Sequence, residues 1–316
     1  MISLIICSVR PDVCQKMLDS VAKTIGTEYE AIVFDNREKQ YGICRAYNEA
    51  AKYANGGYLC FVHEDIVIKT EGWGRRLIDF SNKTDNCGVI GIAGGKNALN
   101  PFFDWGGDGK NSRYRYYDPP VGIEKTEGNC YDSGLVYRYR NPKNEEFTKS
   151  VALDGLFLFT SRKIWEENPF DENYFTGFHF YDADFTFAIA QKHQNYVYFG
   201  IEVYHFSGGS PNKAYCDNIL LFQKKWNDCL PYCLPGYEVS LLHELNSAAA
   251  IFHLHRKNAF SRMKSLKRIY SMSGALFTAL LCCGLFVKAL LRFVMRRPKV
   301  YKKTASLEAS AKERMK

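Results

Sequence analysis

The chain has 316 residues, enough for one large hydrophobic core or for one core with an appendage. Its hydrophobic content of 46% and charged content of 24% are ordinary for a globular protein, which argues against a disordered or fibrous chain. The net charge of +8 is uneven, because residues 256–316 hold 16 Lys and Arg against 2 Asp and Glu, whereas residues 1–255 hold 26 against 32. A mildly acidic body with a basic tail indicates a polyanionic neighbour for the tail.

The cysteines and the first residues indicate the compartment. The count of eleven is odd, and several cysteines lie in apolar runs, as buried free thiols do: Cys7, Cys60, Cys282 and Cys283. Met1 leads directly into the apolar run 2–7 without a basic region, which predicts a first strand and not an export signal. Both features favour a reducing cytoplasm.

The first hundred residues alternate between short apolar runs and helical patterns. Strands are expected at 2–7, 30–34, 58–62 and 87–93, and helices at 11–25 and 42–53. This alternation predicts an α/β fold with a mainly parallel, Rossmann-like sheet and helices on both faces.

The alternation resumes after an irregular segment. Residues 100–150 are rich in Gly, Tyr, Trp, Asp and Arg, and they form either a hairpin or lid over a cleft or a surface insertion. Beyond them we expect strands at 150–160, kinked at Asp154-Gly155, and at 196–204, with helices at 181–194 and 218–226. The pattern ends near Pro235, which predicts a catalytic domain of residues 1–235 and a helical tail of residues 236–316.

Polar residues follow several of the predicted strands. Strand ends in a parallel sheet with right-handed crossovers point to one rim, which is where ligands bind in open α/β sheets. The groups expected at this rim are Asp35-Asn36, His63-Glu64-Asp65, Asp154-Gly155 and His205.

Asp65 and His205 are the candidate metal ligands. One carboxylate and one imidazole leave coordination positions for phosphate oxygens and water, which suits Mg²⁺ or Mn²⁺, with Mn²⁺ more tolerant of imidazole. Alternatively, His205 is a hydrogen-bonded histidine that precedes the Gly208-Gly209 turn.

Asp182 and Asp184 open a predicted helix, where the helix dipole and capping favour carboxylates. Because they lie two residues apart on a helix, at most one can face a given reacting atom. A carboxylate held at the cleft can act as a general base on a substrate hydroxyl.

Four motifs in order resemble the GT-A nucleotide-sugar glycosyltransferases of the family-2-like group. These are the strand end at Asp35-Asn36, Gly42-x-x-x-Ala46-x-Asn48, the strand that closes on His63-Glu64-Asp65, and the acidic pair within HFYDAD. The variants VHEDI, HFYDAD and FQKKWNDCLP resemble the StrF-type subgroup. The resemblance covers about residues 1–231.

The resemblance implies a role for each site residue. Asp182 matches the catalytic base, and Asp65 and His205 match the ligands of the metal that holds the pyrophosphate. The implied substrate contacts are Asp35 and Asn36 to the nucleotide base, His63 where an aspartate usually stands, and Glu64, Asp154 and Asp184, of which Asp184 matches a more structural acid.

The implied reaction is transfer of a sugar from a nucleoside diphosphate to an acceptor hydroxyl, with inversion and with Mn²⁺ or Mg²⁺. A glycan or a lipid-linked molecule is the expected acceptor, in cell-surface polysaccharide or glycolipid synthesis. The alternative is a binding protein on the same fold with a decayed metal site, as His63 in place of an aspartate would allow. A dinucleotide oxidoreductase is disfavoured, because no Gly-x-Gly-x-x-Gly follows the first strand.

The tail combines apolar and basic residues. Residues 269–287 are nineteen uncharged residues, near the roughly 20 that span a bilayer. Lys288, Arg292 and Arg296 then form one basic stripe on a helix. We expect the helix to lie in the interface of an anionic membrane, so that the protein is peripheral at the inner face of the plasma membrane. A single span and a soluble helix are the alternatives, and no nucleic-acid readout motif is present.

Overall fold

The computed structural model describes residues 1–102, 144–206 and 211–294. Its centre is a seven-stranded sheet in the order β2-β1-β3-β10-β5-β11-β8. Five strands run in one direction, and β10 and β8 run in the other. The mainly parallel α/β fold expected from the sequence is therefore confirmed, with two reversed strands that the alternation of elements did not reveal.

The first half of the fold follows the predicted alternation closely. It contains β1 (Ile2–Ser8), α1 (Pro11–Thr24), β2 (Tyr29–Asp35), α2 (Ile43–Ala51), β3 (Tyr58–His63), β4 (Ile66–Ile68), α3 (Trp73–Lys83), β5 (Cys87–Gly91), β6 (Gly94–Gly95) and β7 (Asn97–Ala98). Pro11 occupies the first turn of α1, where its missing N–H costs nothing. Strand β1 is almost fully buried, as expected for a strand covered on both faces.

The second half differs from expectation at two places. The elements are β8 (Phe147–Ser150), β9 (Ala152–Leu153), β10 (Phe157–Ser161), α4 (Arg162–Glu167), α5 (Tyr181–Ala190), β11 (Gln194–Tyr198), β12 (Val203–His205), α6 (Lys213–Trp226), a 3₁₀ turn (Asn227–Cys229) and β13 (Tyr232–Cys233). The single strands predicted at 150–160 and at 196–204 are wrong, because in each the chain leaves one sheet and enters another. Nearly all of the segment interpreted as a hairpin or lid lies outside the described residues, apart from the stretch that forms β8.

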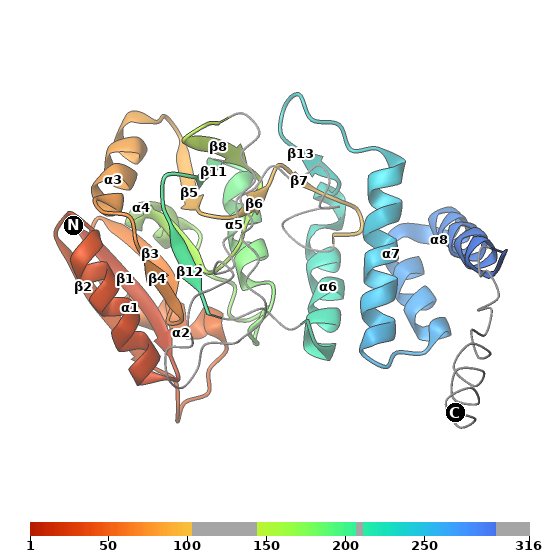
Figure 1. Cartoon of the computed structure of the whole chain (residues 1–316), viewed down its shortest axis with the longest axis horizontal. Coiled ribbons are helices and arrows are strands. Elements are labelled where there is room, and N and C mark those ends of the chain that lie inside the picture. Colours follow the sequence, from red (N-terminus) through yellow and green to blue (C-terminus); the bar gives the residue numbers. More distant parts are fainter. Residues whose placement is uncertain (103–143, 207–210, 295–316) are drawn as a thin grey trace, which may run out of the picture.

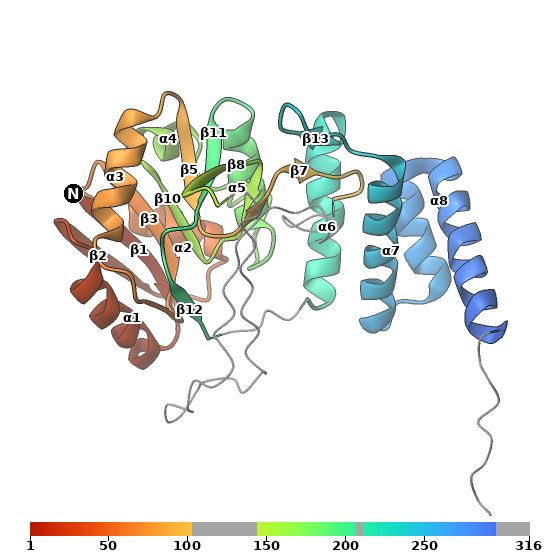
Figure 2. The ribbon, with the colours of Figure 1, turned by 45° about the horizontal axis from the view of Figure 1, so that its top comes forward.

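Helices cover both faces of the sheet, as predicted (Figures 1 and 2). One hydrophobic cluster joins the sheet to α1 and α3 through Met17, Val21 and Trp73. The other joins it to α2, α5 and α6 through Tyr47, Phe185 and Phe222. The sheet rim at the carboxyl ends of β1, β2 and β3 is left between these two layers.

The C-terminal region is helical, with α7 (Leu241–Lys257) and α8 (Arg262–Val294) packed beside α6. Ser240 caps α7 in a capping box with His243, and α8 is interrupted at Gly274, whose φ of 79° is left-handed. In Figure 1 these helices lie beyond α6, away from the sheet. Among the described residues, no helix is both long and apolar enough to cross a membrane.

Candidate active site

Strand register brings the predicted polar groups to one rim. In the parallel pairs, Ser8 of β1 lies opposite Asp35 of β2, and Cys7 lies opposite His63 of β3. After the Glu64-Asp65 turn the chain forms β4, which pairs with β12 so that His205 lies opposite Ile66. The peptide N–H of Phe206 also donates to the carbonyl of Asp65 at 2.9 Å. Residues about 140 positions apart in the sequence are thus neighbours.

His63, Asp65 and His205 form a cluster that could hold a metal ion. Their ligand atoms all lie within 4.8 Å of one another. Asp65 Oδ1 is 3.4 Å from His205 Nε2 and 4.0 Å from His63 Nδ1. Asp65 and His205 are buried, and His63 is half-buried. Two imidazoles and a carboxylate form a recognised ligand set for divalent transition metals.

Two neighbours, Arg10 and His205, keep the Asp65 carboxyl group ionised. Its Oδ2 accepts a hydrogen bond from Arg10 Nη2 at 3.1 Å. Burial acts to raise the pKa of this carboxyl, but the hydrogen-bonding contacts with His205 and Arg10 outweigh burial and hold the pKa well below its usual range. The carboxylate is therefore ionised at neutral pH, as a metal ligand must be.

The Glu64 carboxylate is hydrogen-bonded to groups of the protein itself. Its carboxylate accepts hydrogen bonds from the Ser8 hydroxyl at 2.7 Å, from the N–H groups of Val9 and Arg10 at 3.1 and 3.0 Å, and from Arg10 Nε at 3.0 Å. A buried carboxylate with this many donors fixes the turn between β1 and α1. These contacts describe a structural role, and the substrate contact expected of Glu64 stays a prediction.

His63 has a specific partner on α5. Its Nε2 lies 2.6 Å from the hydroxyl of Tyr181, which is buried at the start of that helix. Burial first, and then the neighbouring His205 and Arg10, lower the pKa of His63 to about 4, with Asp65 acting in the opposite direction. The imidazole is therefore neutral at pH 7, the form that binds metals.

Asp182 lies beside the Asp154-Gly155 turn. Its Oδ2 accepts a hydrogen bond from the Gly155 N–H at 2.9 Å. A Cβ on Gly155 would lie 2.0 Å from the Tyr181 hydroxyl and 2.8 Å from Asp182 Cβ. Only glycine at position 155 therefore allows α5 to pack this close to the turn. Asp182 is thereby hydrogen-bonded to the turn that contains Asp154, and the preceding residue on α5, Tyr181, is hydrogen-bonded to His63.

The pKa of Asp182 is raised to about 7, first by burial and then by the charge of Asp154, while the N–H groups of Ala183 and Gly155 lower it. A carboxyl group that titrates near neutral pH is suited to proton transfer.

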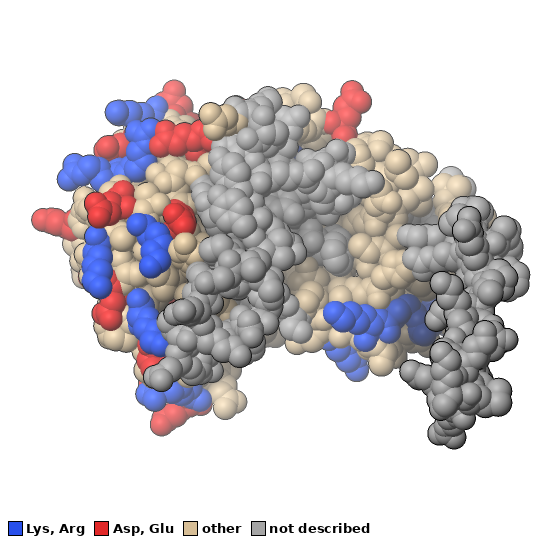
Figure 3. All heavy atoms as spheres, in the orientation of Figure 1, with Lys and Arg blue, Asp and Glu red and all other residues tan. Residues whose placement is uncertain are grey.

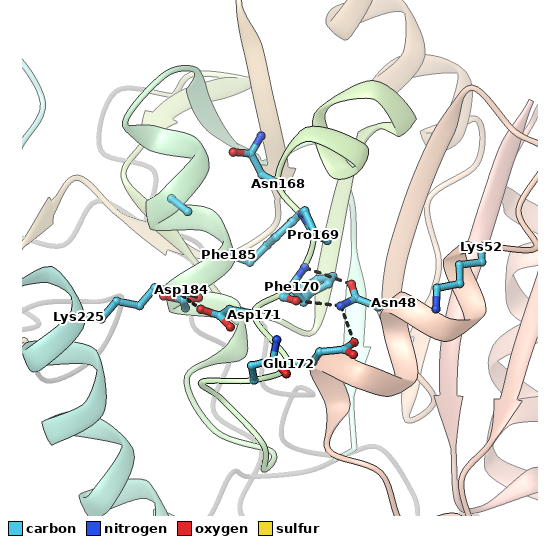
Figure 4. Close-up of a pocket in the computed structure, with 12 residues that line it drawn as sticks. Asn48, Lys52, Asn168, Pro169, Phe170, Asp171, Glu172, Asp184, Phe185 and Lys225 are labelled. Atoms are coloured by element: carbon cyan, nitrogen blue, oxygen red, sulfur yellow. Dashed lines mark hydrogen bonds and ion pairs between the residues drawn. The ribbon is translucent and has the colours of Figure 1, made fainter.

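The Asp184 side chain contacts helix α6. It is buried, and it accepts hydrogen bonds from Lys225 Nζ at 2.8 Å and from Trp226 Nε1 at 2.7 Å, both on α6. It borders a cavity of about 570 Å³ between α2, α5 and α6, which Figure 4 shows with Asp171, Glu172 and Lys52 at its edge. These contacts fasten α6 to α5, which fits the more structural acid implied by the resemblance; its substrate contact stays a prediction.

Asp35 and Asn36 differ in exposure. Asp35 is exposed and pairs with Arg37, whose guanidinium lowers the pKa of the carboxyl to about 2. Asn36 is buried, and its side chain bonds both the N–H and the carbonyl of Tyr41, which closes the loop before α2. The Asp35 carboxylate is therefore exposed at the rim in an ion pair with Arg37, whereas the Asn36 amide shapes the loop.

The Ala46-x-Asn48 part of the motif has a structural explanation. Asn48 is buried, and its amide donates to the Phe170 carbonyl at 2.8 Å and to Glu172 at 2.9 Å. Its Oδ1 accepts from the Phe170 N–H at 3.1 Å (Figure 4). The asparagine therefore fixes the loop that leads to α5, and with it the position of Asp182.

Three residues at the rim were not identified from the sequence. Arg10 follows the first strand directly, so its position after a strand was an available signal. Tyr181 precedes the acidic pair, but nothing in the sequence links it to His63. Phe178 is 57% exposed, with its ring centroid 5.9 Å from that of His63, and an exposed aromatic next to a polar cluster is a surface on which a sugar can stack.

The mainly parallel α/β sheet and the polar rim at its strand ends agree with the GT-A-like fold that the sequence motifs indicate. The family model "Glycosyltransferase like family" matches residues 3–216, about two thirds of the chain. The chain therefore belongs to this family of glycosyltransferases. No curated protein sequence matches it.

The solved structures that match the chain share little sequence with it. S. aureus TarS 1–349 in complex with UDP is 15% identical, with a TM-score of 0.43, and the match covers 87% of this chain and 75% of TarS. GalNAc-T7 with UDP, GalNAc and Mn²⁺ is 14% identical, with a TM-score of 0.45, and the match covers 84% and 56%. A197 from STIV is 14% identical, with a TM-score of 0.36, and the match covers 66% and 86%.

Proposed function

We propose that this glycosyltransferase moves a sugar from a nucleoside diphosphate to an acceptor hydroxyl with inversion at the anomeric carbon. The proposal is supported by the cluster of one carboxylate and two imidazoles at the sheet rim, because open α/β sheets bind their ligands at the carboxyl ends of the strands. Asp35, exposed at the end of β2, is placed to contact the nucleotide base. The catalytic domain in this proposal is residues 1–235.

The residues at the rim fit a divalent ion. Asp65 and His205 would hold it, since Arg10 binds Oδ2 of the ionised Asp65, whereas Oδ1 lies 3.4 Å from His205 Nε2. A Mn²⁺ or Mg²⁺ ion bound there supplies positive charge to the departing nucleoside diphosphate. Arg10, whose guanidinium is one third exposed, adds a fixed positive charge beside the same oxygens.

Asp182 would take the proton from the acceptor hydroxyl. It accepts a hydrogen bond from the Gly155 N–H, and the neighbouring Asp154 would bind a sugar hydroxyl. A single base is enough for a direct displacement, because no enzyme-bound glycosyl intermediate has to form and break.

A binding protein with a decayed metal site is the second candidate, because His63 replaces an expected aspartate. Calorimetry with UDP, GDP and dTDP, with and without Mn²⁺, separates the two functions. The enzyme predicts nucleotide binding that requires the metal, together with slow hydrolysis of the matching nucleotide sugar. Binding that is independent of the metal, without hydrolysis, would favour the binding protein.

The end of the helical region suggests where the enzyme works. Residues 245–294 contain no Asp or Glu, and exposed cations gather where α6 begins and α7 turns into α8: Lys213, Arg256, Lys257, Arg262, Lys264 and Lys267. We call these six residues the basic end. Asn258 ties this turn to α6 through the Pro211 carbonyl at 3.2 Å. Figure 3 shows Lys and Arg gathered along the lower edge beneath α6 and α7.

The basic end fits the anionic headgroups of a membrane. Met263 and Tyr270, 64% and 56% exposed, stand among its cations, and a mixture of cations with apolar side chains is typical of helices that lie on lipid. In Figure 1 this edge is the one toward which β12 also ends, so the rim faces the same side. A lipid-linked or glycan acceptor at the inner face of the plasma membrane would then reach the rim.

A further inference from the structure

His63 lies between a hydroxyl and a carboxylate. Its Nε2 is 2.6 Å from the Tyr181 hydroxyl, and its Nδ1 is 4.0 Å from Asp65 Oδ1. A distance of 4.0 Å is too long for a hydrogen bond. Two ligands at right angles around one ion, each with a bond of about 2.1 Å, lie roughly 3 Å apart, and ligands across the ion lie about 4 Å apart. The 4.0 Å between His63 Nδ1 and Asp65 Oδ1 therefore suits two ligands of one metal ion better than a direct hydrogen bond.

The tautomer of His63 depends on what Tyr181 does. A neutral imidazole carries its proton on one nitrogen only. If Nε2 carries it and donates to the Tyr181 oxygen, the Nδ1 lone pair is free and faces Asp65 and His205. Metal-binding histidines commonly use the other ring nitrogen to donate to an oxygen, which fixes the ring and its tautomer.

We propose that His63 is a third protein ligand of the ion, with Tyr181 as the residue that positions it, and that the site therefore selects Mn²⁺ over Mg²⁺. The inference deepens the proposed function, since it assumes a metal between Asp65 and His205. Two imidazoles and one carboxylate favour a transition metal, because Mg²⁺ prefers oxygen ligands. His63 in place of an aspartate then marks a change of metal preference and not a decayed site.

Titration calorimetry with the metal alone tests the selectivity. MnCl₂ and MgCl₂ are each titrated into the full chain without nucleotide. Wild type should bind Mn²⁺ at least about tenfold more tightly than Mg²⁺. His63→Ala should lose most of this difference, because one nitrogen ligand is gone. Equal affinity of wild type for the two ions would overturn the selectivity.

A matched pair of tyrosine variants tests the positioning. Tyr181→Phe removes the hydroxyl and should weaken Mn²⁺ binding about 10- to 100-fold. Tyr47→Phe is the control, because its buried hydroxyl has no hydrogen-bond partner among the residues that the structure describes, and its ring lies 5.9 Å from that of Tyr181. Its Mn²⁺ affinity should equal that of wild type. Equal losses in both variants would mean that packing alone matters, which would contradict a role for the Tyr181 hydroxyl.

Electron spin echo spectroscopy of bound Mn²⁺ counts the coordinated imidazoles and does not depend on turnover. Wild type should show nitrogen modulation from two imidazoles, and His63→Ala from one. One imidazole in wild type would overturn the inference while leaving a metal-dependent transferase in place. Failure of the proposed metal site has a different signature, namely no Mn²⁺ binding to wild type with or without UDP.

Discussion

At the scale of single residues, the proposed transfer depends most on the carboxylate of Asp182. Asp182→Asn keeps the size of the side chain and its ability to accept from the Gly155 N–H, but it removes the base. We expect kcat to fall about 10²- to 10⁴-fold, while the affinity for UDP stays within twofold of wild type. Turnover and UDP calorimetry on the same preparation measure both. Unchanged turnover would assign the base to another residue.

The pH dependence of transfer follows from the same group. Because the pKa of Asp182 is raised to about 7, the base is protonated and inactive below this pH, and the rate should rise through pH 7 to a plateau. Among the described residues, the titratable groups that interact electrostatically with Asp182 include Asp154, Tyr181, Tyr47 and Cys44.

Asp154→Asn removes the nearest like charge, so the midpoint should move to lower pH. A midpoint that stays in place would exclude Asp182 as the titrating base.

The free energy of unfolding should depend on pH in the opposite direction to the rate of transfer. The Asp182 carboxyl contributes its full share to this free energy below its pKa in the unfolded chain, and the contribution is lost as pH rises through about 7.

The sequence was informative about site residues that end strands. Asp65 and His205 lie together because β3, β4 and β12 each have one end at the same rim. Such strand ends can be recognised in the sequence as apolar runs that stop at polar residues. Tyr181 could not be assigned to His63 in this way, because their contact depends on how α5 packs across the sheet. No pattern in the sequence shows that Ser8 and Arg10 surround Glu64, because these contacts depend on how the end of β1 packs against the end of β3.

At the scale of elements, Asn48 joins α2 to the loop before α5. Asn48→Ala leaves the buried N–H of Phe170 without its partner and removes one of the two donors to the Phe170 carbonyl, which should lower the free energy of unfolding by about 1–3 kcal/mol. Urea denaturation measures this loss. Asn173→Ala is the control, because Asn173 lies in the same loop and is exposed, and it should change stability by less than about 0.5 kcal/mol.

Element boundaries were predicted well where one element lies in one sheet. Strands β1, β2 and β3 follow apolar runs closely. The two failures, at 150–160 and 196–204, have a common cause. An apolar run stays apolar when the chain moves from one sheet to another, so periodicity does not show the break, and pairing partners such as β4 for β12 lie far away in the sequence.

At the scale of the whole molecule, the basic end and the rim lie along one edge, so binding to a membrane would bring acceptor and site together. Lys257→Glu/Lys264→Glu/Lys267→Glu should reduce sedimentation with phosphatidylserine vesicles at least about tenfold, at roughly 1 kcal/mol per cation. Arg75→Glu/Lys83→Glu on α3, at the opposite end of the molecule, is the control and should bind nearly as wild type does. Equal loss in both variants would indicate a general charge effect and no docking surface.

The proposed transfer depends on one metal ion held between the Asp65 carboxylate and the His205 imidazole. The most direct test is anomalous diffraction from a crystal of the full chain grown with MnCl₂ and UDP. We expect one strong Mn²⁺ peak within bonding distance of Asp65 and His205, with the pyrophosphate of UDP against it. UDP bound at the rim without a peak there, or a peak elsewhere on the chain, would contradict the account.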